Sequence, residues 1–161
     1  MTPLKRAVIY RHPNIVKFLI DSGCEYNASI GGKLIHEVLA YCQKNSYSPP
    51  FFSAFENTCN ALIGKGANLN MVNSRGDSVC HSAFKLNSGE WSRYNAIQYL
   101  IDRGAPINST DKNGLTILDL SYKYNYLKLA KYIKEKGGKE SLNSPYTRKG
   151  VKGFLNRIKN L

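Results

Sequence analysis

The chain has 161 residues, of which 42% are hydrophobic and 21% are charged, so it can form a folded core and is not an intrinsically disordered polymer. Its 23 lysine and arginine residues against 11 aspartate and glutamate residues give a formal net charge of +12, which favours acidic partners: a negative protein face, nucleic acid or an anionic lipid surface. The sequence has neither an apolar run of the ~20 residues that a membrane-spanning helix needs nor a secretory signal at its start, so we expect a cytoplasmic protein.

The cysteines are spread along the chain and form no C-x-x-C pair and no zinc-type spacing with histidine; they are Cys24, Cys42, Cys59 and Cys80. A disulfide framework is not expected at this length and cysteine density, so reduced thiols buried as small apolar side chains are the better interpretation. We therefore expect an intracellular protein that binds no metal and no other cofactor.

The chain begins with a predicted pair of short helices. Apolar residues recur there at helical spacing in two runs: Leu4, Ala7 and Val8, then Ile15, Val16, Leu19 and Ile20. Thr2 is a suitable N-cap for the first helix, as Ser78 and Thr116 are for two later ones. Pro3 suits the first helical turn, where its missing N–H costs nothing. Gly23 lies where the second helix should stop, at the position that favours a left-handed backbone.

The same arrangement recurs three more times along the chain. The helix starts that align are TPLKRAV (2–8), KLIHEVL (33–39), SVCHSAF (78–84) and TILDLSY (116–122), and the glycines that close the units are Gly23, Gly66, Gly104 and Gly137. Three units follow a glycine-containing turn, namely SIGG (29–32), SRGD (74–77) and DKNG (111–114). A helix pair with one apolar face cannot bury that face alone, so we expect the units to stack on one another.

This pattern of a turn with glycine, a T-P-L-H-like helix start, a second apolar helix and a G-A-x-x-N close resembles the ankyrin repeat. The resemblance covers roughly residues 1–139 as four degenerate repeats, at about 1–27, 28–70, 71–108 and 109–139. It implies an all-α solenoid of stacked helix-turn-helix pairs with β-turn fingers between them.

Repeats 2 and 3 are longer than an ankyrin unit, and the additional residues lie at 44–53 and 87–94, between the two helices of each pair. Pro49 and Pro50 exclude a helix in the first insertion and predict an extended or turn segment. In the second insertion, Trp91 is a candidate exposed anchor for a partner.

The aromatic residues of the first insertion allow two interpretations. Tyr47, Phe51 and Phe52 could form an anchor for a partner, because aromatic side chains dominate binding hot spots. Alternatively, Phe51, Phe52 and Phe55 belong to the start of the second helix and are buried there, which is the common environment of phenylalanine.

Residues 140–161 are predicted to form a basic tail outside the repeats. Apolar residues near its end, from Val151 to Leu161, follow helical spacing and predict a short amphipathic helix. The helix is expected to cap the end of the stack. The alternative is a helix that lies on anionic lipid through Lys152, Arg157 and Lys159.

Catalytic motifs are missing from the sequence: there is no phosphate-binding loop, nucleophile elbow or zinc-protease helix. His36 and His81 occupy the histidine position of the T-P-L-H pattern, where the resemblance implies a structural hydrogen-bonding role. Cys80 and His81 are adjacent, so on a helix they point to different faces and do not form a nucleophile–base pair. We therefore do not expect an enzyme.

The resemblance implies that a partner binds to the fingers and to the exposed face of each first helix, which together form a concave groove. The candidate residues are Ile30, Ser74, Arg75, Asp77, Lys112 and Asn113 on the fingers, Tyr10, Tyr41, Lys85, Lys123 and Tyr124 on the first helices, and Trp91. Tyr10, Tyr41 and Tyr124 recur at one repeat position and, with the basic residues, predict an aromatic and basic groove. The alternative is that these tyrosines only cover the helix surface.

These observations predict a noncatalytic, monomeric interaction module that binds an acidic protein partner. Degenerate repeats rich in Asn, Lys and Tyr are similar to ankyrin proteins that intracellular bacteria or large viruses put into host cells, which predicts an effector of the host cytoplasm. The alternative function is binding to nucleic acid or to an anionic membrane through the basic surface and tail, which steep salt dependence would reveal. A third interpretation is a targeting arm of a larger enzyme.

Overall fold

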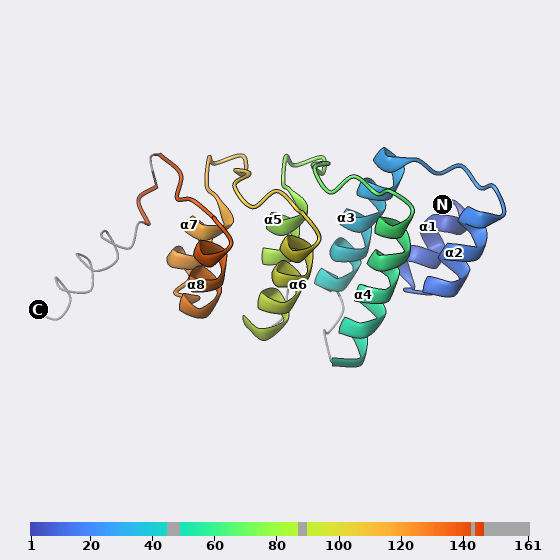
Figure 1. Cartoon of the computed structure of the whole chain (residues 1–161), viewed down its shortest axis with the longest axis horizontal. Coiled ribbons are helices and arrows are strands. Elements are labelled where there is room, and N and C mark those ends of the chain that lie inside the picture. Colours follow the sequence, from blue (N-terminus) through green and yellow to red (C-terminus); the bar gives the residue numbers. More distant parts are fainter. Residues whose placement is uncertain (45–48, 87–89, 143, 147–161) are drawn as a thin grey trace, which may run out of the picture. The chain divides into compact units, whose positions relative to one another are not determined.

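The computed structural model describes residues 1–44, 49–86, 90–142 and 144–146 (Figure 1). Within these residues the chain forms helices and no named strand, so the predicted all-α fold class is confirmed. The helices are α1 (Pro3–Ile9), α2 (Pro13–Asp21), α3 (Ala28–Lys44), α4 (Pro49–Gly64), α5 (Val79–Phe84), α6 (Glu90–Asp102), α7 (Ile117–Lys123) and α8 (Leu127–Glu135).

The chain divides into two compact units, residues 1–105 and 106–161. The first unit holds three helix pairs. Its first helices α1, α3 and α5 pack on one another in one layer, and its second helices α2, α4 and α6 pack in another. The second unit holds the pair α7 and α8. The predicted division into repeats 1–139 and a tail from residue 140 stays a prediction.

Side-chain caps explain where three first helices begin. The hydroxyl of Thr2 accepts a hydrogen bond from the backbone N–H of Lys5, and Ser78 does the same for His81. Thr116 caps α7 in a capping box: its hydroxyl accepts a hydrogen bond from the backbone N–H of Asp119, and the Asp119 carboxylate accepts one from the backbone N–H of Thr116. The N-caps predicted from the sequence are therefore confirmed, and each satisfies a helix N–H that has no partner within the helix.

The closing glycines end the second helices as predicted. Their φ angles lie between 86° and 88°, in the left-handed region that residues with a Cβ rarely adopt; they are Gly23, Gly66, Gly104 and Gly137. In the first repeat, the N–H of Gly23 bonds the carbonyl of Ile20, and the N–H of Cys24 bonds that of Leu19. These bonds satisfy helix carbonyls at the end of α2.

The core of the first unit lies between its two layers of helices. Its fully buried aliphatic and aromatic side chains include Val8, Val16, Ile35, Leu39, Phe55, Leu62, Ile97 and Leu100. One polar bond also joins repeats 1 and 2, because the Tyr26 hydroxyl donates to the Leu62 carbonyl over 2.6 Å. Within repeat 2, the Asn68 N–H donates to the Ala28 carbonyl over 2.8 Å. Apolar packing and the Tyr26 bond together hold the first two repeats in register.

The predicted turn finger at residues 29–32 is wrong, because α3 already begins at Ala28. The Asn27 side chain caps this helix by accepting a hydrogen bond from the Ile30 N–H over 2.9 Å. A Cβ on Gly31 would collide with the Tyr26 hydroxyl and Ala67, and a Cβ on Gly32 would collide with the Asn68 carbonyl. These glycines allow close packing of two segments and are not the turn residues predicted from the sequence.

The expectation that Pro49 and Pro50 exclude a helix is also wrong, because α4 begins at Pro49. Proline is compatible with the first helical turn, where no N–H is needed for an intrahelical bond. Of the two interpretations of the aromatic residues, the one that places Phe52 and Phe55 in the second helix is confirmed. Tyr47 lies outside the described residues.

The second insertion also contributes to a helix. α6 begins at Glu90, so Trp91 lies in its first turn rather than in a loop. With 13 residues in α6 and 16 in α4, these second helices are longer than α2, which has 9. Much of the additional length of repeats 2 and 3 therefore extends their second helices.

The predicted amphipathic helix in the tail, with Lys152, Arg157 and Lys159, lies outside the described residues. Among the residues that are described, no helix combines the length and the apolar character needed to cross a membrane.

Candidate binding surface

A rigid finger precedes α5 in the first unit. The Asn73 side-chain oxygen accepts hydrogen bonds from the backbone N–H groups of Arg75 (2.8 Å) and Asp77 (3.0 Å), and Gly76 has a φ of 78°. This local network closes the turn, so that Ser74 and Arg75 are exposed at its tip. The finger predicted at 74–77 is therefore present, and two of its candidate residues can reach a partner.

Asp77, by contrast, is buried and cannot contact a partner directly. Its carboxylate accepts hydrogen bonds from Lys85 (2.6 Å) and Asn73 (3.2 Å), and the Arg75 guanidinium lies 3.4 Å away. Burial alone would raise the pKa of Asp77, but these hydrogen bonds and the two cations outweigh it and lower the pKa. Asp77 thus stays ionised and positions Lys85 and Arg75 on the surface.

His36 connects α3 to the finger and to α5. Its Nε2 lies 2.9 Å from the Met71 carbonyl, which can only accept, so Nε2 carries the proton. Its Nδ1 then accepts from the Ser82 hydroxyl over 2.9 Å, and Ser82 Oγ accepts in turn from the Asn73 side-chain amide over 3.3 Å. These contacts fit the structural role that the resemblance implies for His36.

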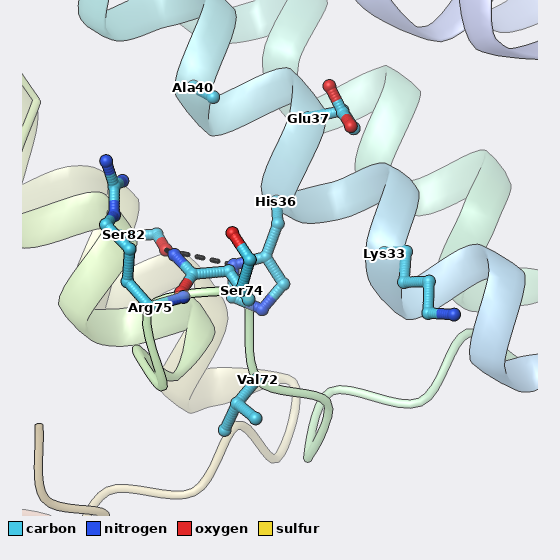
Figure 2. Close-up of a pocket in the computed structure, with 9 residues that line it drawn as sticks. Lys33, His36, Glu37, Ala40, Val72, Ser74, Arg75 and Ser82 are labelled. Carbon is cyan, nitrogen blue, oxygen red and sulfur yellow. Dashed lines mark hydrogen bonds between the residues drawn. The ribbon is translucent and has the colours of Figure 1, made fainter. Parts of the chain in front are cut away.

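A pocket of about 590 Å³ lies between α3 and the finger (Figure 2). It is lined by Lys33, His36, Glu37, Ala40, Val72, Asn73, Ser74, Arg75 and Ser82, and we call it the α3–finger pocket. Figure 2 shows Lys33 and Arg75 on opposite sides of His36. Both cations are exposed, and the carboxylate of Glu37 is already paired with Lys5 of α1 at 2.8 Å. The pocket therefore offers two cations, and its one lining carboxylate is neutralised.

Two of the predicted tyrosines are brought together at the ends of the first helices. Tyr10 and Tyr41 contact each other edge to face, with ring centroids 5.8 Å apart, and the Arg11 guanidinium lies 5.5 Å from the Tyr41 centroid. Tyr10 is 51% exposed. Such rigid aromatic side chains provide contact area at low entropic cost.

Trp91 and Ile30 are not among the residues that line the α3–finger pocket. Trp91 is 55% exposed on α6, a second helix, and its indole contacts the Phe52 ring edge to face at 6.1 Å. Ile30 is half-buried in the first turn of α3 rather than on a finger. The structure thus separates these two candidates from the residues around the α3–finger pocket.

The second unit carries its own finger and aromatic cluster. Asp111 accepts hydrogen bonds from the N–H groups of Asn113 (2.8 Å) and Leu115 (3.0 Å), which leaves Lys112 and Asn113 exposed. At the end of α7, the Lys123 ammonium lies 5.5 Å from the Tyr124 ring centroid and 5.3 Å from that of Tyr146. Tyr124 also stacks on Tyr126 at 6.2 Å.

Lys33 and Glu37 were not predicted to be surface residues of the site. They occupy positions i and i+4 of one helix, in phase with Ala40, and therefore lie on one face. This spacing is the sequence signal that could have revealed them. Val72, which is 52% exposed on the rim of the pocket, carries no comparable sequence signal.

The arrangement offers binding groups rather than reactive ones. Burial raises the pKa of Cys42, Cys59 and Cys80, so these thiols stay protonated. In the part of the chain that the structure describes, no three His, Cys, Asp or Glu side chains are grouped to hold a metal ion. The exposed groups that converge are cations, tyrosines and hydrogen-bonding side chains, which suit the recognition of a negatively charged surface.

Comparisons with known proteins agree with the repeated helix pairs of this fold. A family model described as ankyrin repeats (3 copies) matches residues 51–144, and the model of a single ankyrin repeat matches residues 1–30. A putative ankyrin repeat protein of Rickettsia felis is 31% identical over 127 residues, which are 79% of this chain and 29% of that relative. The chain thus spans less than a third of that relative's length.

Proposed function

Because the chain belongs to the ankyrin-repeat family, whose members are generally noncatalytic protein-interaction modules, we propose that it is an adaptor that binds an acidic segment of a partner protein. The segment lies across the first-helix surface of the first unit, from the tyrosine pair to the α3–finger pocket. Tyr10 and Tyr41 supply aromatic contact area, and Lys33 and Arg75 supply the positive charge.

The observation that carries this proposal is the charge of that surface. Among the described side chains of the first helices, the residues that follow them and the finger, six are basic (Lys5, Arg6, Arg11, Lys33, Arg75 and Lys85) and two are acidic (Glu37 and Asp77). Both carboxylates are already bound by lysines, at 2.8 Å and 2.6 Å. An acidic ligand therefore meets little repulsion there and finds Lys33 and Arg75 within one pocket.

The test is capture of partners from cell lysate with the wild-type chain and with a Lys33→Glu/Arg75→Gln variant, followed by mass spectrometry. We expect wild type to retain a discrete acidic protein and the variant to retain at least about tenfold less of it. A Lys128→Glu/Lys131→Gln variant is the matched control, since it changes the net charge equally at two exposed residues of α8.

Equal loss of capture in both variants would show that net charge, rather than the α3–finger pocket, governs binding. Unchanged capture in the Lys33→Glu/Arg75→Gln variant would remove the pocket from the proposal. All variants must first give the wild-type helical circular dichroism spectrum, so that loss of folding is not mistaken for loss of binding.

The net charge of +12 also favours a second candidate, binding to nucleic acid or to an anionic membrane through the basic tail. Deletion of residues 147–161 separates the two functions. It removes Lys152, Arg157 and Lys159 but keeps the hydrogen bond from the Ser141 N–H to Asp119 in the second unit. Loss of RNA or anionic-vesicle binding with unchanged protein capture would assign the tail a role of its own.

The predicted site of action, the cytoplasm of a host cell, is part of the same proposal. Two observations support it: the repeats are degenerate and rich in Asn, Lys and Tyr, and the chain is similar to a putative ankyrin repeat protein of Rickettsia felis. Fractionation of infected or transfected cells with an antibody to the chain tests it, and recovery in the producing organism alone would reject an effector role.

A further inference from the structure

The α3–finger pocket carries more positive charge than one acidic side chain of a partner can balance. The charged side chains that line it, with the ion pairs to which they belong, are Lys5, Lys33, Arg75, Lys85, Glu37 and Asp77. Four positive charges thus face two negative ones and leave a net charge of +2. His36 adds no charge, because its Nδ1 accepts the hydrogen bond from Ser82. A single Asp or Glu of a partner would leave half of this excess unbalanced.

Lys33 and Arg75 carry this excess. Among the described residues, Lys33 forms no ion pair, and its side chain is exposed. Arg75 shares the Asp77 carboxylate with Lys85, which lies closer to it, at 2.6 Å against 3.4 Å. Lys33 belongs to α3 and Arg75 to the finger, and Figure 2 shows them on opposite sides of His36. A ligand in the pocket is therefore offered one cation by each of the two elements.

The other polar side chains of the pocket either can donate a hydrogen bond or are already engaged. The Ser74 hydroxyl is exposed at the finger tip and can donate. His36 is bonded to the Met71 carbonyl and to Ser82, and the Asn73 amide donates to Ser82 over 3.3 Å. The pocket thus presents donors to a ligand with several acceptor oxygens. A phosphate group has three such oxygens, which guanidinium and ammonium groups bind well.

Charge distinguishes the kinds of anion that could fill the pocket. A phosphomonoester carries about −1.5 to −2 charges at pH 7, close to the excess of the pocket, whereas a carboxylate or one phosphodiester of a nucleic acid carries a single charge. The net charge of +2 at one place therefore favours a phosphomonoester. The volume of about 590 Å³ leaves room for the side chain that bears the phosphate, with Ala40 and Val72 as apolar contacts.

We propose that the α3–finger pocket binds a phosphomonoester, the phosphorylated serine, threonine or tyrosine of the acidic partner segment. This inference rests on the proposed function, because it names the group of that segment that occupies the pocket. It makes capture of the partner depend on a kinase that acts on the partner. The Asn73 side chain already holds the finger backbone through the N–H groups of Arg75 and Asp77, so binding orders little additional chain.

The first test measures the chemistry of the pocket without a partner. Phenyl phosphate and benzoate share one ring and differ in their anionic group, and each is titrated into the isotope-labelled full chain at about pH 7.5, where the phosphate is a dianion. We expect phenyl phosphate to bind at least about tenfold more tightly, with amide NMR shifts centred on Ser74 and Arg75. The Lys33→Glu/Arg75→Gln variant should lose this preference, and the Lys128→Glu/Lys131→Gln control should keep it.

The second test uses the natural partner. Cell lysate is treated with a protein phosphatase, the phosphatase is inhibited, and only then is the chain added for capture. We expect the treatment to lower capture of the acidic protein by wild type at least about tenfold. The residual capture by the Lys33→Glu/Arg75→Gln variant should not change, because that variant no longer distinguishes the phosphate.

The outcomes separate this inference from the proposed function. Equal capture from treated and untreated lysate would overturn the phosphate inference and leave the adaptor function standing, as would equal affinity for phenyl phosphate and benzoate. Capture of no acidic protein from either lysate would reject the proposed function. Phenyl phosphate binding in that case would assign the pocket to a free phosphomonoester and overturn the partner assignment. Circular dichroism must be unchanged, and Lys33→Gln serves as the second variant if the double substitution disturbs folding.

Discussion

His36 shows how one side chain fixes the geometry of the candidate surface. Its Nδ1 accepts a hydrogen bond from the Ser82 hydroxyl, and its Nε2 donates one to the Met71 carbonyl. His36 therefore holds α3, α5 and the segment before the finger together. Only the neutral imidazole satisfies both partners as they stand. Protonation of Nδ1 would leave the Ser82 hydroxyl without this acceptor and would place a charge in a largely buried site.

The pH dependence of stability follows from this arrangement. Burial lowers the pKa of His36, and it outweighs the opposite effects of the Met71 bond and of the Asp77 and Glu37 carboxylates. A lowered folded-state pKa means that the unfolded chain binds the proton first. The stabilisation is therefore complete above the unfolded pKa of about 6.5 and is lost as the pH falls from there through the folded pKa.

We expect wild type to lose more unfolding free energy between about pH 7.5 and pH 5 than a His36→Gln variant, which has no titrating group there. The variant itself should be about 1–2 kcal/mol less stable at the higher pH, because one of the buried bonds is lost or weakened. Urea unfolding followed by the fluorescence of Trp91, the single tryptophan, reports on the first unit. Equal pH slopes in both proteins would contradict the role given to His36.

At the scale of helices, the start of α3 depends on the absence of two side chains. Gly31 and Gly32 lie inside the helix, where a Cβ would collide with Ala67 and with the Asn68 carbonyl. Ala67 and Asn68 lie near the end of repeat 2. This segment packs directly against the α3 backbone, and its Asn68 N–H donates a hydrogen bond to the Ala28 carbonyl. Close approach of two backbones, rather than a turn, explains both glycines.

Substitution by alanine distinguishes these explanations. Gly32→Ala should destabilise the first unit by about 1–3 kcal/mol, because the Asn68 carbonyl is backbone and cannot easily move. Gly64→Ala is the control: Gly64 ends α4, no atom lies within 4 Å of its added Cβ, and the change should be neutral or stabilise by up to ~0.5 kcal/mol. Urea unfolding measures both, and a neutral Gly32→Ala would mean that the packing there adapts.

The contrast between these glycines also shows what can be predicted from the sequence. The caps at Thr2, Ser78 and Thr116 and the four closing glycines follow local rules, because each acts on its own helix end, and they were predicted correctly. Gly31, Gly32, Pro49 and Pro50 were assigned wrongly because each residue type is compatible with two environments, a turn or a helix. Only the neighbouring segment decides between them.

The candidate surface was predictable to a similar degree. Tyr10 and Tyr41 occupy the same position in their repeats, which predicted that they lie on the same side of the array. The two rings do contact each other. The burial of Asp77 was not foreseen, because it results from Lys85 and Asn73 converging on one carboxylate. Lys33 and Val72 join one pocket only after α3 and the finger are placed together.

For the whole molecule, the net charge of +12 favours association with an acidic partner. Binding of an acidic segment gains from the positive first-helix surface, so screening of charge weakens it. Salt therefore tests the role of charge in the proposed binding without any mutation.

We expect a rise from about 0.05 M to 0.5 M NaCl, which shortens the Debye length to a few ångströms, to lower partner capture several-fold. Partner capture is read from the lysate experiment. Capture that is insensitive to salt would instead assign partner recognition to Tyr10 and Tyr41 rather than to Lys33 and Arg75, since apolar contact is not screened.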